Sequence, residues 1–499
     1  GVATAGIVSA TTLYGDGSNL TGVGASIAPL FYQPDPYDTG VLLDAGIGIT
    51  FNQQVKAGSG NVTLSIANAG VAGTVVENFG VGSSVTISEN RITIDPTADI
   101  SATQVYHLSY PSGCFTNNEG TDFVGTAYTF EARAYDYQLW GWGTNLKGYL
   151  GVNNGTQYSS PIQVPGTTWD NIGSSAYTSL TNAAIKSDGT LWLIGNNEYG
   201  QLGQNDDTGG GSNISYSSPV QLPGTTWSQV WHGYYNMQAT KTDGTLWAWG
   251  ANNNGLCGQN NAIPVRYSSP VQIPGTTWTN DSNKMSIGYK NTLHVKTDGT
   301  LWSWGYNQHG QLGLNNTTQY SSPTQIPGTT WKYAKAGWSN FATKTDGTLW
   351  AWGYNYYGEL GQNDNTNAHK SSPTQIPGTN WVLANSHRNH TLATKTDGTL
   401  WVWGRNNKGQ YGSNTIDDGK SSPVQVGSAT DWNTTEFQAA YWWSVALKTN
   451  GELWAMGDNS AGGLGQNDTT NRSSPVQIPG TDWYKIKPWY LAVAGVKRI

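Results

Sequence analysis

A tandem repeat dominates this chain and limits the folds that it can adopt. The repeat core, Leu-Trp-x-Trp-Gly, occurs seven times between residues 139 and 457, at spacings of 48 to 55 residues. In two copies Ile194 and Met456 replace the second Trp. Repeats of this length are supersecondary units that bury their apolar faces only by stacking on neighbouring copies. The sequence therefore predicts a repeat architecture for most of the chain.

The residues around the core predict a small antiparallel sheet for each copy. Alternation places both Trp rings on one face of a strand. Asp-Gly, or Asn-Gly in the last copy, precedes six of the cores and favours a hairpin turn, because Gly accepts positive φ. Asn-x-x-Gly follows every core and suits a turn with left-handed residues. The Ser-Ser-Pro that comes next marks an edge strand or a loop, because proline lacks the ladder donor of a central strand.

The two ends of the repeat region predict a closed ring. The first copy lacks the strand that precedes the turn in the other copies, and the chain continues past the last Pro-Gly-Thr-Asp-Trp for one more strand, around residues 491–499. A C-terminal strand that completes the first unit explains both facts, whereas an open solenoid explains neither. We therefore predict an all-β fold with a seven-bladed β-propeller over residues 135–499, closed by the C-terminal strand.

The full repeat pattern resembles the regulator of chromosome condensation repeat family. Asp-Gly-x-Leu-Trp-x-Trp-Gly-x-Asn-x-x-Gly-Gln-Leu-Gly is complete at residues 298–313 and nearly complete in other copies. The resemblance implies a seven-bladed propeller. It does not imply the nucleotide exchange at chromatin of the founding member, because this chain has a net charge of −7 and scattered Lys and Arg residues. We expect no nucleic-acid partner, since phosphate binding needs a basic stripe.

Residues 27–134 lack the repeat and predict an Ig-like β-sandwich. Short alternating strands are expected at residues 47–51, 62–66, 84–87, 91–94, 105–110 and 127–132. The order of these strands and of the glycines between them looks like the bacterial Ig-like domain of S-layer and adhesin proteins. Asn117, Asn118, Glu119 and Asp122 form either a calcium loop or, as we favour, a solvated turn.

Residues 1–26 are too few to form a core of their own. The segment at residues 6–22 is similar to one in tail-fibre and other structural proteins of marine bacteriophages. That resemblance implies a stem that docks on other virion proteins. A homo-oligomer, trimeric by analogy with phage fibres, is a further expectation.

The sequence shows no site of covalent chemistry. No phosphate-binding loop, zinc spacing or nucleophile elbow is present. Cys114 and Cys257 are interpreted as small buried hydrophobes, and His387 and His390 flank Arg388 in either a site or, as we favour, a polar loop. The Asp-Gly carboxylates recur in the repeats and are expected to form turns. We predict no catalytic residue, no metal, no cofactor and no enzymatic activity, and no apolar run reaches the roughly 18 residues needed for membrane insertion.

Aromatic residues outside the repeat template gather in one variable segment of each copy, between Pro-Gly-Thr-x-Trp and the next strand. We expect them on one face of the ring or around its channel, either as core packing between blades or as an aromatic platform for glycan. Among them, Tyr234, Trp338 and Trp442 are our first candidates for glycan contact. The candidate ligand-binding residues are Trp231, Tyr234, Tyr235, Tyr289, Trp338, Arg388, Tyr441, Trp442, Trp443 and Trp489.

These observations predict a non-enzymatic virion structural protein. It would be a bacteriophage fibre or appendage at the virion surface, which displays the propeller for attachment to a host-surface glycan or protein. The alternative is a secreted or cell-surface bacterial adhesin, because an Ig-like domain fits either. A polysaccharide-active enzyme is disfavoured, since no carboxylate or His cluster stands out.

Overall fold

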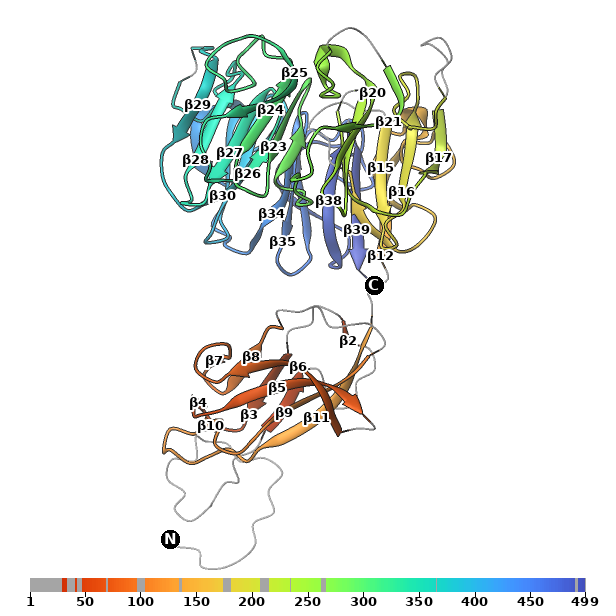
Figure 1. Ribbon diagram of the computed structural model, residues 1–499. Coiled ribbons are helices and arrows are strands. Elements are labelled where there is room, and N and C mark those ends of the chain that lie inside the picture. The colour runs from red at the N-terminus through yellow and green to blue at the C-terminus, as the bar shows by residue number, and fades with distance from the viewer. Residues whose placement is uncertain are drawn as a thin grey trace, which may run out of the picture. The chain divides into compact units, whose positions relative to one another are not determined.

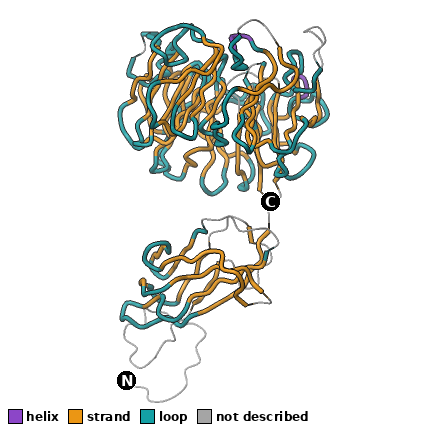
Figure 2. Tube along the Cα trace, in the orientation of Figure 1, coloured by secondary structure: helices purple, strands orange, loops and turns teal. Residues whose placement is uncertain are grey.

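The chain divides into two compact units, residues 1–135 and residues 136–499. The computed structural model describes residues 29–33, 41–42, 47–68, 71–96, 104–133, 137–173, 181–206, 215–233, 235–261, 266–364, 366–489 and 492–498. The stem expected at residues 1–26 lies outside the described residues. Strands make up nearly all of the regular structure (Figure 2), and no described helix is long and apolar enough to cross a membrane.

The N-terminal unit is a β-sandwich with an aromatic core. One sheet has the order β1 (Pro29–Gln33), β3 (Ile47–Phe51), β8 (Arg91–Ile94) and β7 (Thr86–Ser88). The other has the order β2 (Val41–Leu42), β11 (Thr126–Arg133), β9 (Val105–Tyr110), β5 (Asn61–Asn68) and β6 (Val71–Gly80). A short pair, β4 (Lys56–Ala57) and β10 (Phe115–Thr116), lies beside them. Phe51 and Phe123 meet in the core, with ring centroids 4.5 Å apart.

The six strands expected in this unit are present, and the sequence missed β6 and the shorter strands β1, β2, β4 and β10. Strand β6 lies at a sheet edge and is exposed over its first half, so no alternation of apolar residues marks it. The segment at residues 117–122 is a turn stabilised by one side chain. Asn117 Oδ1 accepts hydrogen bonds from the amides of Glu119 and Thr121, at 3.0 and 2.8 Å. Cys114 and Cys257 are buried free thiols, as expected.

The described residues of the C-terminal unit form seven four-stranded antiparallel sheets, one for each repeat (Figure 1). Sheet 1 contains, from inner to outer strand, β38 (Trp483–Trp489), β39 (Ala492–Arg498), β12 (Tyr137–Gly143) and β13 (Tyr158–Gln163). In the same order, sheet 2 contains β14 (Trp169–Ile172), β15 (Thr181–Lys186), β16 (Leu191–Asn196) and β17 (Ser215–Leu222), and sheet 3 contains β18 (Trp227–His232), β19 (Asn236–Lys241), β20 (Leu246–Ala251) and β21 (Arg266–Ile273). Sheet 4 contains β22 (Met285–Ile287), β23 (Asn291–Val295), β24 (Leu301–Gly305) and β25 (Tyr320–Ile326), and sheet 5 contains β26 (Trp331–Lys335), β27 (Ser339–Lys344), β28 (Leu349–Gly353) and β29 (Lys370–Ile376). Sheet 6 contains β30 (Trp381–Ser386), β31 (His390–Lys395), β32 (Leu400–Asn406) and β33 (Asp417–Gln425), and sheet 7 contains β34 (Trp432–Ala439), β35 (Trp443–Lys448), β36 (Leu453–Gly457) and β37 (Arg472–Ile478). Short 3-10 helices, η1 (Leu146–Gly148) and η2 (Asn253–Gly255), follow the third strands of sheets 1 and 3.

Sheet 1 closes the ring with strands from both ends of the unit. β39 pairs with β12 along its length, from Arg498 opposite Tyr137 to Ala492 opposite Gly143. The inner strands of consecutive sheets lie against one another, and β38 contacts both β34 and β14. The prediction that the C-terminal strand completes the first unit is confirmed, and β38 joins it there.

The predicted Asp-Gly or Asn-Gly turns are present in six copies, and the predicted edge strands are present in all seven described sheets. Gly244 has a φ of 78°, and Asp243 Oδ1 accepts from Thr245 N and Oγ1 at 3.0 and 2.7 Å. Thr245 Oγ1 in turn accepts from the indole of Trp247 at 2.8 Å. These hydrogen bonds hold the Asp243 pKa below its usual value, which identifies the carboxylate as a turn former. Ser-Ser-Pro lies in the outer strand of every sheet.

Neighbouring sheets are joined by a hydrogen bond to one recurring backbone carbonyl. It belongs to the residue after the glycine of Asn-x-x-Gly. At five interfaces the donor is the indole of the second core Trp of the next sheet. These hydrogen bonds run from Trp249 to the carbonyl of Gln201 (2.7 Å), from Trp304 to that of Leu256 (3.0 Å), from Trp352 to that of Gln311 (2.8 Å), from Trp403 to that of Glu359 (2.6 Å) and from Trp142 to that of Gly463 (2.9 Å). Where Ile194 and Met456 replace that Trp, Asn182 Nδ2 donates to Tyr149 O at 2.7 Å and Ser444 Oγ donates to Gln410 O at 2.9 Å.

A second contact between neighbouring sheets explains why the glycine of Asn-x-x-Gly and the first serine of Ser-Ser-Pro recur. We call this contact and the hydrogen bond above the joints between sheets. Gly310 has a φ of 78°, and a β-carbon added there would lie 2.5 Å from Cα of Ser371 in the next sheet. The amide of Asn315 donates to the carbonyl of that serine at 2.8 Å. Only glycine permits this approach of the two backbones. The same contact occurs at all seven interfaces between neighbouring described sheets, which we call seams.

Deletion of residues 492–498 tests the closure of the ring. Loss of β39 leaves β12 and β38 without their common partner and exposes the apolar faces of sheet 1. We expect a lower melting temperature for the whole propeller and self-association through the open edges. Calorimetry and light scattering measure both. A monomeric truncated protein with an unchanged melting temperature would contradict ring closure.

Candidate functional site

Loops that differ among the copies gather on one face of the propeller. Along each sheet, the connection from the first to the second strand and that from the third to the fourth lie at the same end, because consecutive strands are antiparallel. We call this end the loop face; it is uppermost in Figure 1. The Asp-Gly and Pro-Gly-Thr turns lie at the opposite end, the turn face. The chain begins the propeller at the turn face, since Tyr137 pairs with Arg498 there.

Aromatic side chains from sheets 4 and 5 form a continuous cluster on the loop face. Tyr289 stacks on Trp338 with ring centroids 4.5 Å apart and planes 12° apart. Trp338 contacts Tyr354 at 5.3 Å, and Tyr354 stacks on Tyr356 at 6.2 Å. Tyr356, which is 50% exposed, contacts Tyr357 at 4.7 Å. With His309 and His369, these residues are the loop-face aromatic cluster.

The two histidines of the cluster are held as neutral rings. His309 lies 5.4 Å from Tyr354 and 4.6 Å from His369, measured between ring centroids. His369 Nδ1 accepts a hydrogen bond from the amide of Asn355 at 3.2 Å. Burial lowers the pKa of both imidazoles, and proximity to His309 further lowers that of His369. Both side chains therefore extend the aromatic surface.

Two smaller groups cross other seams on the same face. Arg388 donates from Nη1 to the hydroxyl of Tyr441 at 2.6 Å, and Tyr441 contacts Trp442 at 4.3 Å. Tyr199 contacts Tyr235 at 4.3 Å, between sheets 2 and 3. In both groups a residue of one sheet meets an aromatic ring of the next.

The structure thus brings together part of the predicted platform. Tyr235, Tyr289, Trp338, Arg388, Tyr441 and Trp442 are half-buried on the loop face. Trp231 and Trp443 are 0% and 1% exposed, so the prediction that they form a surface platform is wrong, and core packing is their role. Both lie within strands, β18 and β35, that face a neighbouring sheet. Tyr234 and the side chain of Trp489 lie outside the described residues.

The prediction of a polar loop around Arg388 is also wrong for the two histidines, because both are buried. His387 and His390 are 4% and 0% exposed. Burial lowers the pKa of each to about 3, so both are neutral. His390 Nε2 lies 2.9 Å from Ser444 Oγ across the seam to sheet 7, which makes it a packing residue. Arg388, between them, remains at the loop face.

Sequence analysis missed the aromatic residues of the third-to-fourth connections. These are Tyr354, Tyr356, Tyr357, His309 and His369. The signal was present, because they occupy the positions after Trp-Gly and within and after Asn-x-x-Gly at which the copies differ. The prediction included only the first-to-second connections, whereas antiparallel geometry places both kinds of connection on one face.

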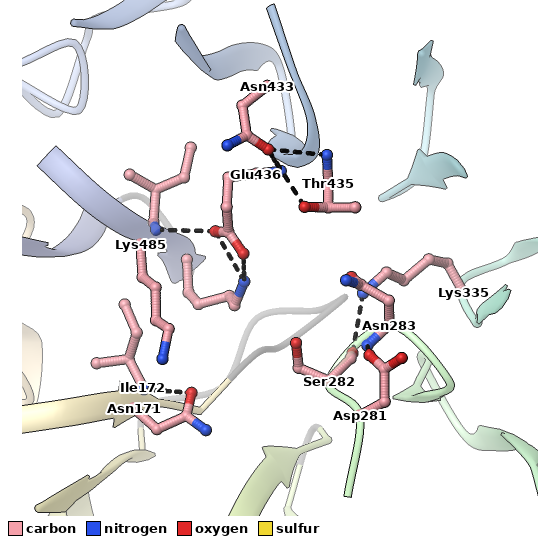
Figure 3. A network of polar contacts seen from close by, with 12 residues as sticks. Asn171, Ile172, Asp281, Ser282, Asn283, Lys335, Asn433, Thr435, Glu436 and Lys485 are labelled. Atoms are coloured by element: carbon pink, nitrogen blue, oxygen red, sulfur yellow. Dashed lines mark hydrogen bonds and ion pairs between the residues drawn. The ribbon is translucent and has the colours of Figure 1, made fainter. Parts of the chain in front are cut away.

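A charged network lines the inner strands (Figure 3). Glu436 accepts from Lys487 Nζ at 3.2 Å and from the amide of Ile486 at 3.1 Å, joining sheets 7 and 1. Lys485 Nζ donates to the carbonyl of Asp170 at 2.9 Å, joining sheets 1 and 2. Lys335 Nζ donates to the carbonyl of Ser282 at 3.1 Å.

The contacts of Glu436 and Lys485 link neighbouring inner strands, and that of Lys335 ties β26 to the turn before β22, so these charges reinforce the ring. Burial, together with the charge of Lys487, lowers the pKa of Lys335 to about 7. No group of three or more His, Cys, Asp or Glu among the described residues could hold a metal ion.

Glu359 lies buried beneath the aromatic cluster, at a position where three other copies have Gln. Its Oε2 accepts from the amide of Tyr357 at 2.8 Å, as Gln311 Oε1 accepts from His309 N at 2.9 Å. The side chain is 0% exposed, and burial raises the pKa of the carboxyl to about 8. Glu359 is therefore protonated at neutral pH.

Comparison with family models identifies both kinds of domain. The regulator of chromosome condensation (RCC1) repeat matches residues 243–294, 298–341, 346–394 and 450–487, and a second model of this repeat matches residues 283–311 and 388–410. A bacterial Ig-like domain matches residues 29–132. The chain therefore carries RCC1 repeats, folded as a propeller, and a bacterial Ig-like domain.

Similar proteins include a plant receptor. The chain is 27% identical to the ultraviolet-B receptor UVR8 of Arabidopsis thaliana over 67% of this chain and 76% of UVR8. It is 32% identical to protein RCC2 of Homo sapiens, over 46% of this chain and 37% of RCC2. Prp20p of Saccharomyces cerevisiae has a TM-score of 0.62 at 18% identity, over 72% of this chain and 91% of the yeast chain. Human WBSCR16 has a TM-score of 0.61 at 19% identity, over 72% of this chain and all of that chain. These two solved structures support the propeller fold alone.

Replacement of Glu359 by Gln tests the buried carboxyl. The folded state keeps a proton up to a pH of about 8, whereas the unfolded chain releases it near pH 4.5, so the stability of the natural protein falls as pH rises through this window. Gln keeps the acceptor for Tyr357 N and cannot ionise. Glu359→Gln should raise the melting temperature above pH 6, with the largest gain above pH 8 and almost none at pH 4. The same pH dependence in both proteins would contradict this account.

Replacement of Trp231 and Tyr356 separates packing from surface roles. Trp231→Ala should lower the free energy of unfolding by about 3–5 kcal/mol, because it empties a core site. Tyr356→Ala should change it by less than about 1 kcal/mol, since half of the side chain is exposed. Denaturant unfolding measures both values. Similar losses for the two variants would show that the loop-face cluster is part of the core.

Proposed function

We propose that this chain is a non-enzymatic attachment protein that binds surface glycan through the loop face of its propeller. The loop-face aromatic cluster is the observation that carries the proposal. It joins rings from two sheets at centroid distances of 4.5 to 6.2 Å, and its outermost member is half exposed.

The chemistry of the cluster suits a sugar polymer. A sugar ring has an apolar C–H face that packs on an aromatic ring, and its hydroxyls stay in contact with water or polar side chains. Tyr and Trp serve such amphipathic contacts well, because each joins a broad apolar face to a polar group. Several adjoining rings can engage successive sugars of one chain, so weak contacts add to a useful affinity.

We place this protein at the surface of a virion, as a bacteriophage fibre or appendage. The similarity of residues 6–22 to phage structural proteins supports that location, with docking on other virion proteins through the stem. A secreted or cell-surface bacterial adhesin is the second candidate, and the bacterial Ig-like domain at residues 29–132 supports it equally. Relatives such as the receptor UVR8 support a binding role in both cases.

The glycan proposal is tested with the variants Trp338→Ala and Tyr356→Ala. Loss of one stacked ring should weaken binding by about 1 kcal/mol, or about fivefold, per substitution. Binding to host cells and to a panel of neutral and acidic polysaccharides is measured by flow cytometry and affinity electrophoresis. Tyr484→Ala, a half-buried tyrosine near the turn face, is the control, with melting temperatures recorded for all variants. Undiminished binding by folded Trp338→Ala and Tyr356→Ala would overturn the proposal.

A further inference from the structure

Four cations accompany the aromatic rings on the loop face of sheets 4 to 7. Lys290 Nζ lies 4.7 Å from the ring centre of Tyr289, and the Arg405 guanidinium lies 4.6 Å from that of Tyr357. The Arg388 guanidinium lies 5.4 Å from the ring centre of Tyr441, and Lys408 Nζ lies 5.9 Å from that of Trp442. Each of these distances is within the range of a cation–π contact.

None of these four cations forms an ion pair with a described residue. Other cations of the propeller do: Lys370 pairs with Asp364, Arg472 with Asp468 and Lys487 with Glu436. Lys186, Lys241, Lys344 and Lys395 also form no ion pair with a described residue, so it is the position of the four cations beside the loop-face rings that sets them apart. The four positive charges are therefore available to a ligand.

The acidic groups near the four cations do not neutralise them. Glu359 is buried and protonated at neutral pH, because burial raises its pKa to about 8. Asp364 lies 3.9 Å from Lys370. Asp417 accepts from the amide of Gly419 at 2.8 Å and from Asn406 Nδ2 at 3.1 Å. Asp458, whose amide donates to the carbonyl of Trp442 at 3.0 Å, is a further carboxylate of this face, and neither it nor Asp417 forms an ion pair with one of the four cations.

Cations lie at both ends of a connected path of rings. It runs from Lys290 through Tyr289, Trp338, Tyr354, Tyr356 and Tyr357 to Arg405. Arg388, which interacts electrostatically with Tyr354, begins a branch through Tyr441 and Trp442 to Lys408. The path crosses three seams, so it presents both kinds of group over the loop face of four sheets.

We propose that the loop face of sheets 4 to 7 selects an anionic glycan, with sugar rings on the loop-face aromatic cluster and carboxylate or sulfate groups on Arg388, Arg405, Lys290 and Lys408. The inference rests on the proposed glycan binding and adds the charge of the ligand. A polymer of acidic sugars presents both apolar ring faces and anions, which matches a run of rings with cations at its ends. Charge-assisted hydrogen bonds from Arg to such anions are roughly twice as strong as neutral ones.

The test compares three polymers of similar length: alginate, which carries carboxylates, dextran sulfate and neutral dextran. Affinity electrophoresis and calorimetry measure binding by the full chain at low and high salt. The double variant Arg388→Gln/Arg405→Gln removes two charges, and Trp338→Ala removes a ring. Lys332→Gln is the matched charge control, because Lys332 is exposed at the other end of β26, near the turn face.

We expect at least one anionic polymer to bind more tightly than dextran, with an affinity that falls as salt rises. The Arg double variant should lose at least tenfold in that affinity, and Lys332→Gln should lose none. Preference for alginate or for dextran sulfate then identifies the anion.

Equal affinity for dextran and the anionic polymers, or a double variant as tight as the natural protein, would overturn the charge inference. Sensitivity of dextran binding to Trp338→Ala would in that case still support the proposed function. Binding of polyglutamate or duplex DNA, with no glycan bound at all, would overturn both.

Discussion

At every seam of this propeller a backbone carbonyl accepts a hydrogen bond from the next sheet, and the ring depends on that contact. The carbonyl is buried, and a buried acceptor without a donor costs about 1–3 kcal/mol. The indole of the second core Trp supplies the donor at five seams, while Asn182 and Ser444 supply it where Trp is replaced. The substitutions Ile194 and Met456 are tolerated because another side chain of the same sheet takes over the role.

The joint also explains where the chain is free to vary. Glycine of Asn-x-x-Gly and the first serine of Ser-Ser-Pro are fixed by the close approach of two backbones, as at Gly310 and Ser371. The connections on the loop face take part in the joints only through those fixed positions. Their remaining residues can change without loss of the ring, and it is there that aromatic and cationic side chains collect. A scaffold with repeated joints and variable loops is well suited to present a binding surface.

The sequence predicted those parts of the fold that follow from local, repeated patterns. Strands, Asp-Gly turns, edge strands with Ser-Ser-Pro and closure by the C-terminal strand all rest on short-range rules of backbone geometry. The edge strand β6 escaped notice because it has no buried face over its first half.

The candidate site was predicted only in part, because burial changes from one residue to the next. Trp442 lies in a connection and is half-buried, whereas Trp443 begins β35 and is wholly enclosed. The contact of Tyr289 with Trp338 joins two sheets, so no pattern within one repeat reveals it. That Arg388 and Arg405 pair with no carboxylate of the described residues is likewise a property of the assembled ring.

Hydrogen–deuterium exchange of the full chain, with and without bound glycan, tests the central claim most directly. The account predicts slow exchange in the inner and second strands of all seven sheets, since the joints make the ring open as one unit. Alginate or dextran, whichever binds, should protect only the loop-face connections around residues 288–290, 306–311, 336–338, 354–359, 387–389 and 440–442. Faster, independent exchange of a single sheet, or protection confined to the turn face, would contradict the account.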